Sequence, residues 1–171
     1  KNEDDKLVVA LAYLDNYEEA LESVEDVRRS LLIALIDRKI TKYFSNFDGL
    51  VKKLEKDKFL VVFRYKFLEQ LRNDKFTVLE DVKSVNIGNE MSVTISIGIG
   101  AMNGSYEANY EMARTAIDLA LGRGGDQAVI KEGKTVTYFG GKTNSIEKNT
   151  RVRARVKAHA LRELLEGADN V

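Results

Sequence analysis

The stretch LVKKLEKDKFLVVF, residues 50–63, consists of two short apolar segments on either side of a charged centre. Residues 59–63 are rich in the branched and aromatic side chains that favour strands. The charged centre, Glu55 to Lys58, is short enough for a tight turn, so the stretch predicts an antiparallel hairpin with strands over 50–54 and 59–63. The turn lacks glycine, although tight hairpins usually place Gly or Asn at positive φ. Side chains therefore occupy the tip.

The composition limits the chemistry available to the chain. Its 171 residues suit one domain with an appendage, and 27 basic residues balance 27 acidic ones. This balance argues against bulk electrostatic binding to nucleic acid or to an anionic membrane. There is no Cys and only one His, which excludes disulfides, thiolate chemistry and multi-His metal centres. Any metal ion would be a hard cation held by carboxylates. No apolar run approaches the ~20 residues that span a bilayer.

Hydrophobic periodicity predicts the remaining elements. LVVALAYL (7–14) is a strand buried on both faces. Residues 18–44 have a helical period, with a break expected near 28–30, and residues 66–86 have another, interrupted at Asn73-Asp74. MSVTISIGIG (91–100) alternates, which predicts a strand with one face closely approached by another element. The remaining predictions are a helix over 106–121 ended by Gly122, a hairpin of 127–131 with 135–139, and a last helix over 150–167.

This order predicts an α+β, ferredoxin-like fold. We expect a central antiparallel sheet whose helices cover one face, with the tip of the 50–63 hairpin beside the C-terminal end of the first strand. Residues 1–142 would form the domain, and residues 143–171 a linker and connecting helix.

Several segments resemble the GGDEF domain, the fold of diguanylate cyclases. MSVTISIGIG is similar to that family's serine-glycine strand, and ARTAIDLALGRGGDQAVI to its closing helix and turn. LEKDKF falls where the Gly-Gly-Asp/Glu-Glu-Phe hairpin belongs. Asp57 and Phe59 match that signature, whereas Glu55, Lys56 and Lys58 do not. The resemblance therefore implies a nucleotide-cyclase fold with a degenerate signature.

A narrower resemblance covers the whole chain. AYLDNYEEAL, ALGRGGDQAVIK and YFGGKTNSIEKNTRVRARVKAHALRELL are similar to the membrane-anchored cyclic-di-AMP phosphodiesterases of Gram-positive bacteria. Those proteins carry PAS, degenerate GGDEF, DHH and DHHA1 domains. The resemblance implies a cytoplasmic regulatory module that is a weak ATPase at most, in a phosphodiesterase whose Mn-dependent DHH domain lies outside this chain. The implied partners are ATP or another purine nucleotide, the protein's own PAS and DHH/DHHA1 domains, and a second copy in a homodimer.

Four residues are the candidate nucleotide site: Asp15, Lys56, Asp57 and Lys58. Asp15 and Asp57 could share a Mg²⁺ ion, while the two lysines supply positive charge to phosphate. The family's first-strand acid is replaced by Tyr13, and the tip lacks the glycines whose backbone amides would approach a triphosphate. Diguanylate synthesis is therefore not expected. The alternative is that the tip carries only solvated turn residues, and that the module is a ligand-free structural or dimerising spacer.

Two further motifs suggest binding but have simpler explanations. GRGGD (122–126) resembles a phosphate loop, yet it follows a helix instead of preceding one, so a helix cap and turn is the better interpretation. RVRARVK (151–157) is basic, yet it shares its predicted helix with an apolar seam, which favours a connecting helix over a nucleic-acid contact. His159 belongs to the same helix and is interpreted as an interface residue.

Overall fold

The computed structural model describes residues 3–141, which form one sheet and its flanking helices. The linker and the helix predicted beyond residue 142, with His159, lie outside the described residues. The elements are, in chain order, η1 (Glu3–Asp5), β1 (Leu7–Leu14), α1 (Tyr17–Glu22), α2 (Asp26–Ser45), β2 (Leu50–Glu55), β3 (Lys58–Arg64), η2 (Tyr65–Phe67), α3 (Leu68–Asp74), α4 (Val78–Lys83), β4 (Ile95–Ala101), α5 (Tyr106–Gly122), β5 (Gln127–Glu132) and β6 (Thr135–Gly140).

The sheet has six strands in the order β2-β3-β1-β4-β5-β6, so β1 lies near its centre. Val8 to Ala12 of β1 are almost completely buried, as predicted for a strand covered on both faces. The α+β class and both hairpins are confirmed. The central sheet is antiparallel as predicted, except that β4 and β5 pair in parallel. The helix α5 connects these two strands, and a crossover helix of this kind returns the chain in the same direction.

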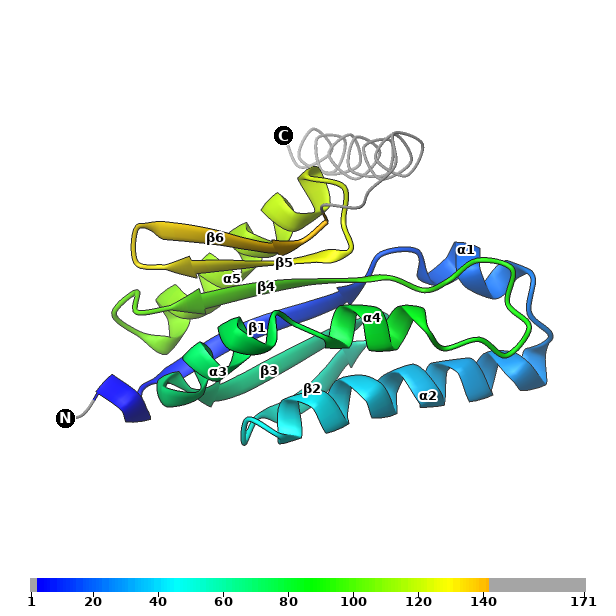
Figure 1. The fold of residues 1–171 in the computed structure, drawn as a ribbon, viewed down its shortest axis with the longest axis horizontal. Coiled ribbons are helices and arrows are strands. Elements are labelled where there is room, and N and C mark those ends of the chain that lie inside the picture. The colour runs from blue at the N-terminus through cyan, green and yellow to red at the C-terminus, as the bar shows by residue number, and fades with distance from the viewer. Residues whose placement is uncertain (1–2, 142–171) are drawn as a thin grey trace, which may run out of the picture.

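The helices cover both faces of the sheet, which corrects the expectation that they cover one. In Figure 1 α2, α3 and α4 lie in front of the strands, while α5 passes behind β4 and β5. Alternation along β1 divides the core accordingly. Val8, Ala10 and Ala12 belong to the cluster shared with α2, α3 and α4, whereas Val9 and Leu11 pack against Ala113 and Ile117 of α5. Strand side chains alternate between the two faces, so one strand supports both layers.

The glycines of β4 allow α5 to pack directly on the strand. A Cβ atom on Gly98 would lie 2.4 Å from the backbone nitrogen of Ile117, and one on Gly100 would lie 2.0 Å from the carbonyl oxygen of Asn109. Real side chains do not tolerate such contacts, so only glycine fits at either position. The close approach predicted from the alternation of residues 91–100 is confirmed, and α5 is the element that makes it.

The first helical segment breaks earlier than expected. The periodicity placed the break near residues 28–30, but α1 ends at Glu22 and α2 begins at Asp26. Val24 lies between them and is buried, while Glu25 has an extended backbone with ψ of 150°. The apolar period continues across the break because Val24 still reaches the core, so periodicity alone did not locate it. The interruption predicted at Asn73-Asp74 is confirmed, since α3 ends at Asp74.

Candidate functional site

The hairpin tip, residues Glu55 to Lys58, closes without a residue at positive φ. Glu55 pairs with Lys58, so Lys56 and Asp57 are the two loop residues. Neither is among the described residues with positive φ. The pairing register shifts between Lys53 and Glu55. Such a bulge increases the local twist, which a turn without positive φ does not supply by itself. The bulge therefore takes the place of the missing glycine, and the side chains of Lys56 and Asp57 remain at the tip.

The tip lies against the end of β1, as the sequence predicted. The amide of Leu14 donates a hydrogen bond to the carbonyl oxygen of Asp57 at 2.9 Å. The next amide, of Asp15, donates to the carbonyl oxygen of Thr94 at 2.9 Å. The backbone of Asp57 and that of Asp15 are thus fixed at the same end of the sheet. Lys56 is exposed at the tip, and Asp57 is half-buried.

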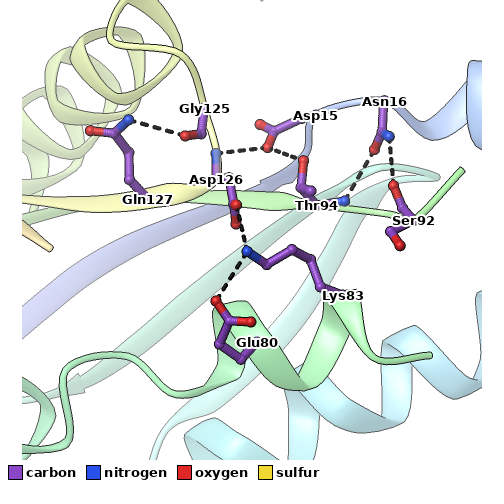
Figure 2. Close-up of polar contacts among 9 residues, drawn as sticks. All are labelled: Asp15, Asn16, Glu80, Lys83, Ser92, Thr94, Gly125, Asp126 and Gln127. Carbon is purple, nitrogen blue, oxygen red and sulfur yellow. Dashed lines mark hydrogen bonds and ion pairs between the residues drawn. The ribbon is translucent and has the colours of Figure 1, made fainter. Parts of the chain in front are cut away.

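The side chain of Asp15 is buried among hydrogen-bond donors, in a site that we call the Asp15 pocket (Asp15, Thr94, Ser96, Gly125 and Asp126). Figure 2 shows all of these residues except Ser96. The hydroxyls of Thr94 and Ser96 each donate to its carboxyl group at 2.6 Å, and the amide of Asp126 donates at 3.0 Å. Burial raises the pKa of Asp15, and the three hydrogen bonds oppose that rise. The carboxyl group therefore joins β1 to β4 and to the loop before β5.

The GRGGD motif supplies one wall of the Asp15 pocket. Gly124, Gly125 and Asp126 all have positive φ, and the amide of Gly125 donates to the carbonyl oxygen of Ala120 at 2.9 Å, ending α5. A Cβ atom on Gly125 would lie 3.1 Å from the carboxyl group of Asp15. The cap-and-turn interpretation is confirmed. The glycines bring a backbone amide to a carboxylate of the same chain, which sequence reasoning missed.

The same loop is attached to α4. The amine of Lys83 lies 2.7 Å from Oδ2 of Asp126 and 3.0 Å from Oε1 of Glu80, as Figure 2 shows. Burial lowers the pKa of Lys83, but the hydrogen bonds to Asp126 and Glu80 outweigh it and raise the pKa overall. Asn16, in the turn between β1 and α1, adds a link, because its side-chain amide nitrogen donates to the carbonyl oxygen of Ser92 at 2.8 Å. The end of the sheet is therefore held by side chains from several elements.

The side chain of Lys58 lies on the α5 face of the sheet and contacts two residues there. Its amine lies 5.2 Å from the ring centroid of Tyr13, the residue opposite it on β1, and 3.3 Å from Oε2 of Glu55. Burial raises the pKa of Tyr13, and the neighbouring Tyr110 adds to the rise. Tyr13, which the resemblance places at the family's first-strand acid, is thus half-buried and covered by a lysine.

A second charged group lies on the opposite face of the hairpin, and sequence reasoning missed it. The amine of Lys53 lies 2.8 Å from Oδ2 of Asp37 on α2 and 5.6 Å from the ring centroid of Phe59. The charges of Lys53, Asp37 and Asp57 also act on the hydroxyl group of Tyr17. Burial raises the pKa of Tyr17, Lys53 opposes the rise, and Asp57 and Asp37 add to it. The alternation of side chains along β2 would have placed Lys53 on the face of Phe59, but no pattern identified Asp37 as its partner.

The residues present fit a bound Mg²⁺ ion poorly at Asp15. Three donors already occupy its carboxyl group, and its raised pKa disfavours the ionised form that a metal ligand requires. Within residues 3–141, no three acidic or histidine side chains are arranged to hold a metal ion. Asp57 is a separate carboxylate at the tip. No helix in this part of the chain is long and apolar enough to cross a membrane.

Comparison with known proteins gives the family. Residues 12–138 match the family described as the cyclic-di-AMP phosphodiesterase GdpP-like GGDEF domain. The chain is 40% identical over 168 residues to the cyclic-di-AMP phosphodiesterase GdpP of Geobacillus thermodenitrificans, covering 98% of this chain and 26% of that protein. It is also 40% identical to the cyclic-di-AMP phosphodiesterase PdeA of Listeria monocytogenes, covering 97% of this chain and 25% of that protein.

Solved structures agree on the fold. An active GGEEF domain of a diguanylate cyclase from Vibrio cholerae has a TM-score of 0.60 at 12% identity, covering 72% of this chain and 81% of that one. The chain spans about a quarter of the length of the phosphodiesterases that it matches. The hairpin, the first strand and the closing helix thus have the arrangement of a GGDEF domain, and the chain belongs to the GGDEF-domain family of GdpP-like cyclic-di-AMP phosphodiesterases.

Proposed function

We propose that this chain is a regulatory module of a cyclic-di-AMP phosphodiesterase, that it binds a purine nucleotide weakly at the hairpin tip, and that it does not synthesise cyclic-di-GMP. The main observation in support of the proposal is the positive charge of the lysines at and beside the hairpin tip. Lys53 lies with Asp57 and the half-buried ring of Tyr17 on one face of the hairpin, Lys58 lies on the other face, and Lys56 extends from the exposed tip between them. Ammonium groups bind phosphate, and an aromatic ring can stack on a base.

The binding would be weak because most of the positive charge is already neutralised. Lys53 pairs with Asp37, and Lys58 pairs with Glu55. A nucleotide must compete with these carboxylates and with solvent. We therefore expect a dissociation constant of about 0.1–1 mM, which corresponds to roughly 4–5.5 kcal/mol. Mg²⁺ would enter on the phosphates of the nucleotide, with Asp57 as the carboxylate that this chain contributes, since Mg²⁺ commonly combines one or two carboxylates with substrate phosphates.

The absence of cyclase activity is supported by the geometry of the first strand. Tyr13 is covered by Lys58, and the carboxyl group of Asp15 is held by Thr94, Ser96 and the Asp126 amide. Tyr13 carries no carboxylate, and the carboxyl oxygens of Asp15 are already occupied by donors of the chain itself, so neither position offers a free carboxylate to a second metal ion. Any residual chemistry would be slow ATP hydrolysis, and regulation of the DHH domain would pass through the residues that follow this module in the full protein.

Isothermal titration with ATP in the presence of Mg²⁺ tests the proposal. Lys56→Ala should weaken binding by about 2–5-fold, in keeping with an exposed charge contact worth ~0.5–1 kcal/mol. Asp57→Ala should remove most of the Mg²⁺ dependence. Lys134→Ala, at the exposed β5–β6 turn, is the matched control and should bind as the wild type does. Absence of heat for all four proteins at 1–2 mM nucleotide would end the proposal.

A ligand-free spacer between the PAS and DHH domains is the second candidate function. The pairing of Lys53 and Lys58 with carboxylates of the chain itself favours it, because a hairpin with paired lysines is complete without a ligand. A ligand that binds only the folded state must raise the melting temperature. An unchanged melting temperature in millimolar ATP, GTP and cyclic dinucleotides would favour the spacer, and a rise with ATP would favour the nucleotide-binding module.

A further inference from the structure

The turn between β4 and α5 contains the dipeptide Asn103-Gly104, the one place in the chain where glycine follows asparagine. Gly104 is exposed and has a φ of 99°, and a Cβ atom placed on it would meet nothing within 4 Å. Because glycine has no side chain, its amide nitrogen is open to approach from the preceding asparagine side chain. Asparagine is most prone to lose its amide group in this sequence context.

The loss of the amide group requires only water. The backbone nitrogen of Gly104 attacks Cγ of Asn103 and gives up its proton. A new bond forms between these two atoms, the bond from Cγ to Nδ2 breaks, and Nδ2 leaves as ammonia. Water then opens the five-membered imide at either of its two carbonyl groups. The product is aspartate, or isoaspartate, in which the backbone runs through the former side chain. In both products a neutral amide has become a carboxylate.

A buried side chain engages Asn103 in the folded chain. Oδ1 of Asn109, a residue that is 5% exposed, accepts from the backbone amide of Asn103 at 2.9 Å and from its Nδ2 at 3.1 Å. Nδ2 of Asn103 also donates to the carbonyl oxygen of Ala101 at 2.9 Å, and Nδ2 of Asn109 donates to that of Leu7 at 3.0 Å. We call these residues the Asn109 network (Leu7, Ala101, Asn103 and Asn109). The Asn103 side chain must leave this network before its Cγ can turn toward Gly104.

We propose that Asn103 is a site of spontaneous deamidation, that the Asn109 network sets its rate in the folded chain, and that the reaction destabilises the end of the sheet where β1 begins. The carboxylate product would face the oxygen atoms of Ala101 and Asn109, to which Asn103 formerly donated. Asn109 cannot reverse its amide to donate to the product without turning its own oxygen toward the carbonyl oxygen of Leu7. The network therefore does not form again after the reaction.

The effect extends beyond the turn because α5 packs on β4 without spare room. A Cβ atom on Gly100 would lie 2.0 Å from the carbonyl oxygen of Asn109, and Gly100 pairs with Val9 of β1. The isoaspartate product lengthens the backbone between this strand and this helix. Figure 1 shows the turn at the end of the sheet where the chain enters β1. The hairpin tip lies at the opposite end of β1, so the inference is independent of nucleotide binding.

Peptide mapping by mass spectrometry of the folded chain, kept warm at mildly alkaline pH, tests the site. Product should accumulate faster at Asn103 than at Asn86, an exposed asparagine that precedes a bulky residue. Asn109→Ala should raise the rate at Asn103 about 3–10-fold, because it removes hydrogen bonds that oppose local opening. Ser105→Ala is the matched control, since it removes the hydrogen bond from the amide of Ala108 at the start of the same helix and leaves the network intact.

The chain unfolded in urea provides a reference that does not depend on any variant. Its rate at Asn103 should exceed that of the folded wild type by about 10-fold or more, because the network is absent. Equal rates in the folded and the unfolded chain would overturn the proposal. So would equal rates at Asn103 and Asn86 in the folded wild type, or equal rates for Asn109→Ala and Ser105→Ala when circular dichroism shows both to be folded.

Asn103→Asp reproduces the change of charge and tests its consequence. The variant should melt about 2–8 °C below the wild type, because the hydrogen bonds of Nδ2 are lost. Amide hydrogen exchange at the start of α5 should become faster. Asn86→Asp is the control, because the side-chain oxygen of Asn86 accepts from the amide of Gly88 at 2.8 Å and aspartate keeps that acceptor. An Asn103→Asp variant as stable as Asn86→Asp would contradict the proposed destabilisation.

Discussion

The carboxyl group of Asp15 accepts a hydrogen bond from the amide of Asp126 at 3.0 Å, although the two residues are 111 positions apart in the chain. This bond joins the end of β1 to the GRGGD loop. The residue that family resemblance suggests as a metal ligand is therefore a buried structural acceptor, and the motif that resembles a phosphate loop supplies its donor. Both features act on the fold, so the nucleotide site that we propose is confined to the hairpin tip.

Asp15→Ala should destabilise the chain by about 3 kcal/mol. The change leaves the hydroxyls of Thr94 and Ser96 and the amide of Asp126 without their acceptor in a buried site, and each such loss costs ~1–3 kcal/mol before relaxation. Asp15→Asn should cost less, because the amide oxygen still accepts. Urea denaturation measures both. An alanine variant as stable as the wild type would mean that the Asp15 pocket does not stabilise the fold.

The contribution of Asp15 should decrease as pH rises. Its pKa is higher in the folded chain than in the unfolded chain, mainly because of burial, so the folded state binds more protons between the two values. Stability from this group is complete below the unfolded pKa, near 3.9, and is lost as pH rises through the folded pKa. The stability of the wild type relative to Asp15→Asn should therefore fall from pH 4 toward neutrality. A relative gain over that interval would show that the folded pKa is lowered instead.

Gly125→Ala should destabilise the chain more than Gly104→Ala. Both glycines have positive φ, so both substitutions cost about 1–2 kcal/mol of backbone strain. Only at Gly125 would the new Cβ atom press on the carboxyl group of Asp15, whereas nothing lies within 4 Å at Gly104. Thermal denaturation of the two variants distinguishes the contact with Asp15, which only Gly125→Ala makes, from the backbone strain that both variants share. Equal losses of stability in the two variants would indicate that the Asp15 pocket accommodates the added methyl group at no further cost.

Much of the fold could be predicted because it depends on local patterns. The alternation of residues 91–100 indicated both the strand and the close approach at Gly98. The candidate site was harder. Asp15 and its partners are 79 to 111 residues apart, and no periodicity relates them. The partnership of Lys53 with Asp37 depends equally on how α2 packs against β2. The sequence could therefore place the hairpin tip beside β1 but could not say which side chains there were already paired.

Asp37→Asn should tighten nucleotide binding. The change keeps the shape of the side chain but removes the negative charge 2.8 Å from the amine of Lys53, leaving that amine available to phosphate. An affinity gain of about 2–5-fold is expected, the size of one partly exposed charge pair. Asp48→Asn, which removes the carboxylate paired with Arg64, is the control and should leave affinity unchanged. A weaker affinity for Asp37→Asn would show that Asp37 supports the nucleotide site.

Titration of Mg²⁺–ATP into the isotope-labelled chain, followed by backbone amide NMR, tests the central claim most directly. We predict progressive, saturable shifts concentrated at Tyr17 and from Lys53 to Lys58, with the β5–β6 turn at Gly133 and Lys134 unchanged. Absence of shifts at millimolar nucleotide, or shifts that cluster away from the hairpin tip, would contradict the assignment of this hairpin as a nucleotide-binding element.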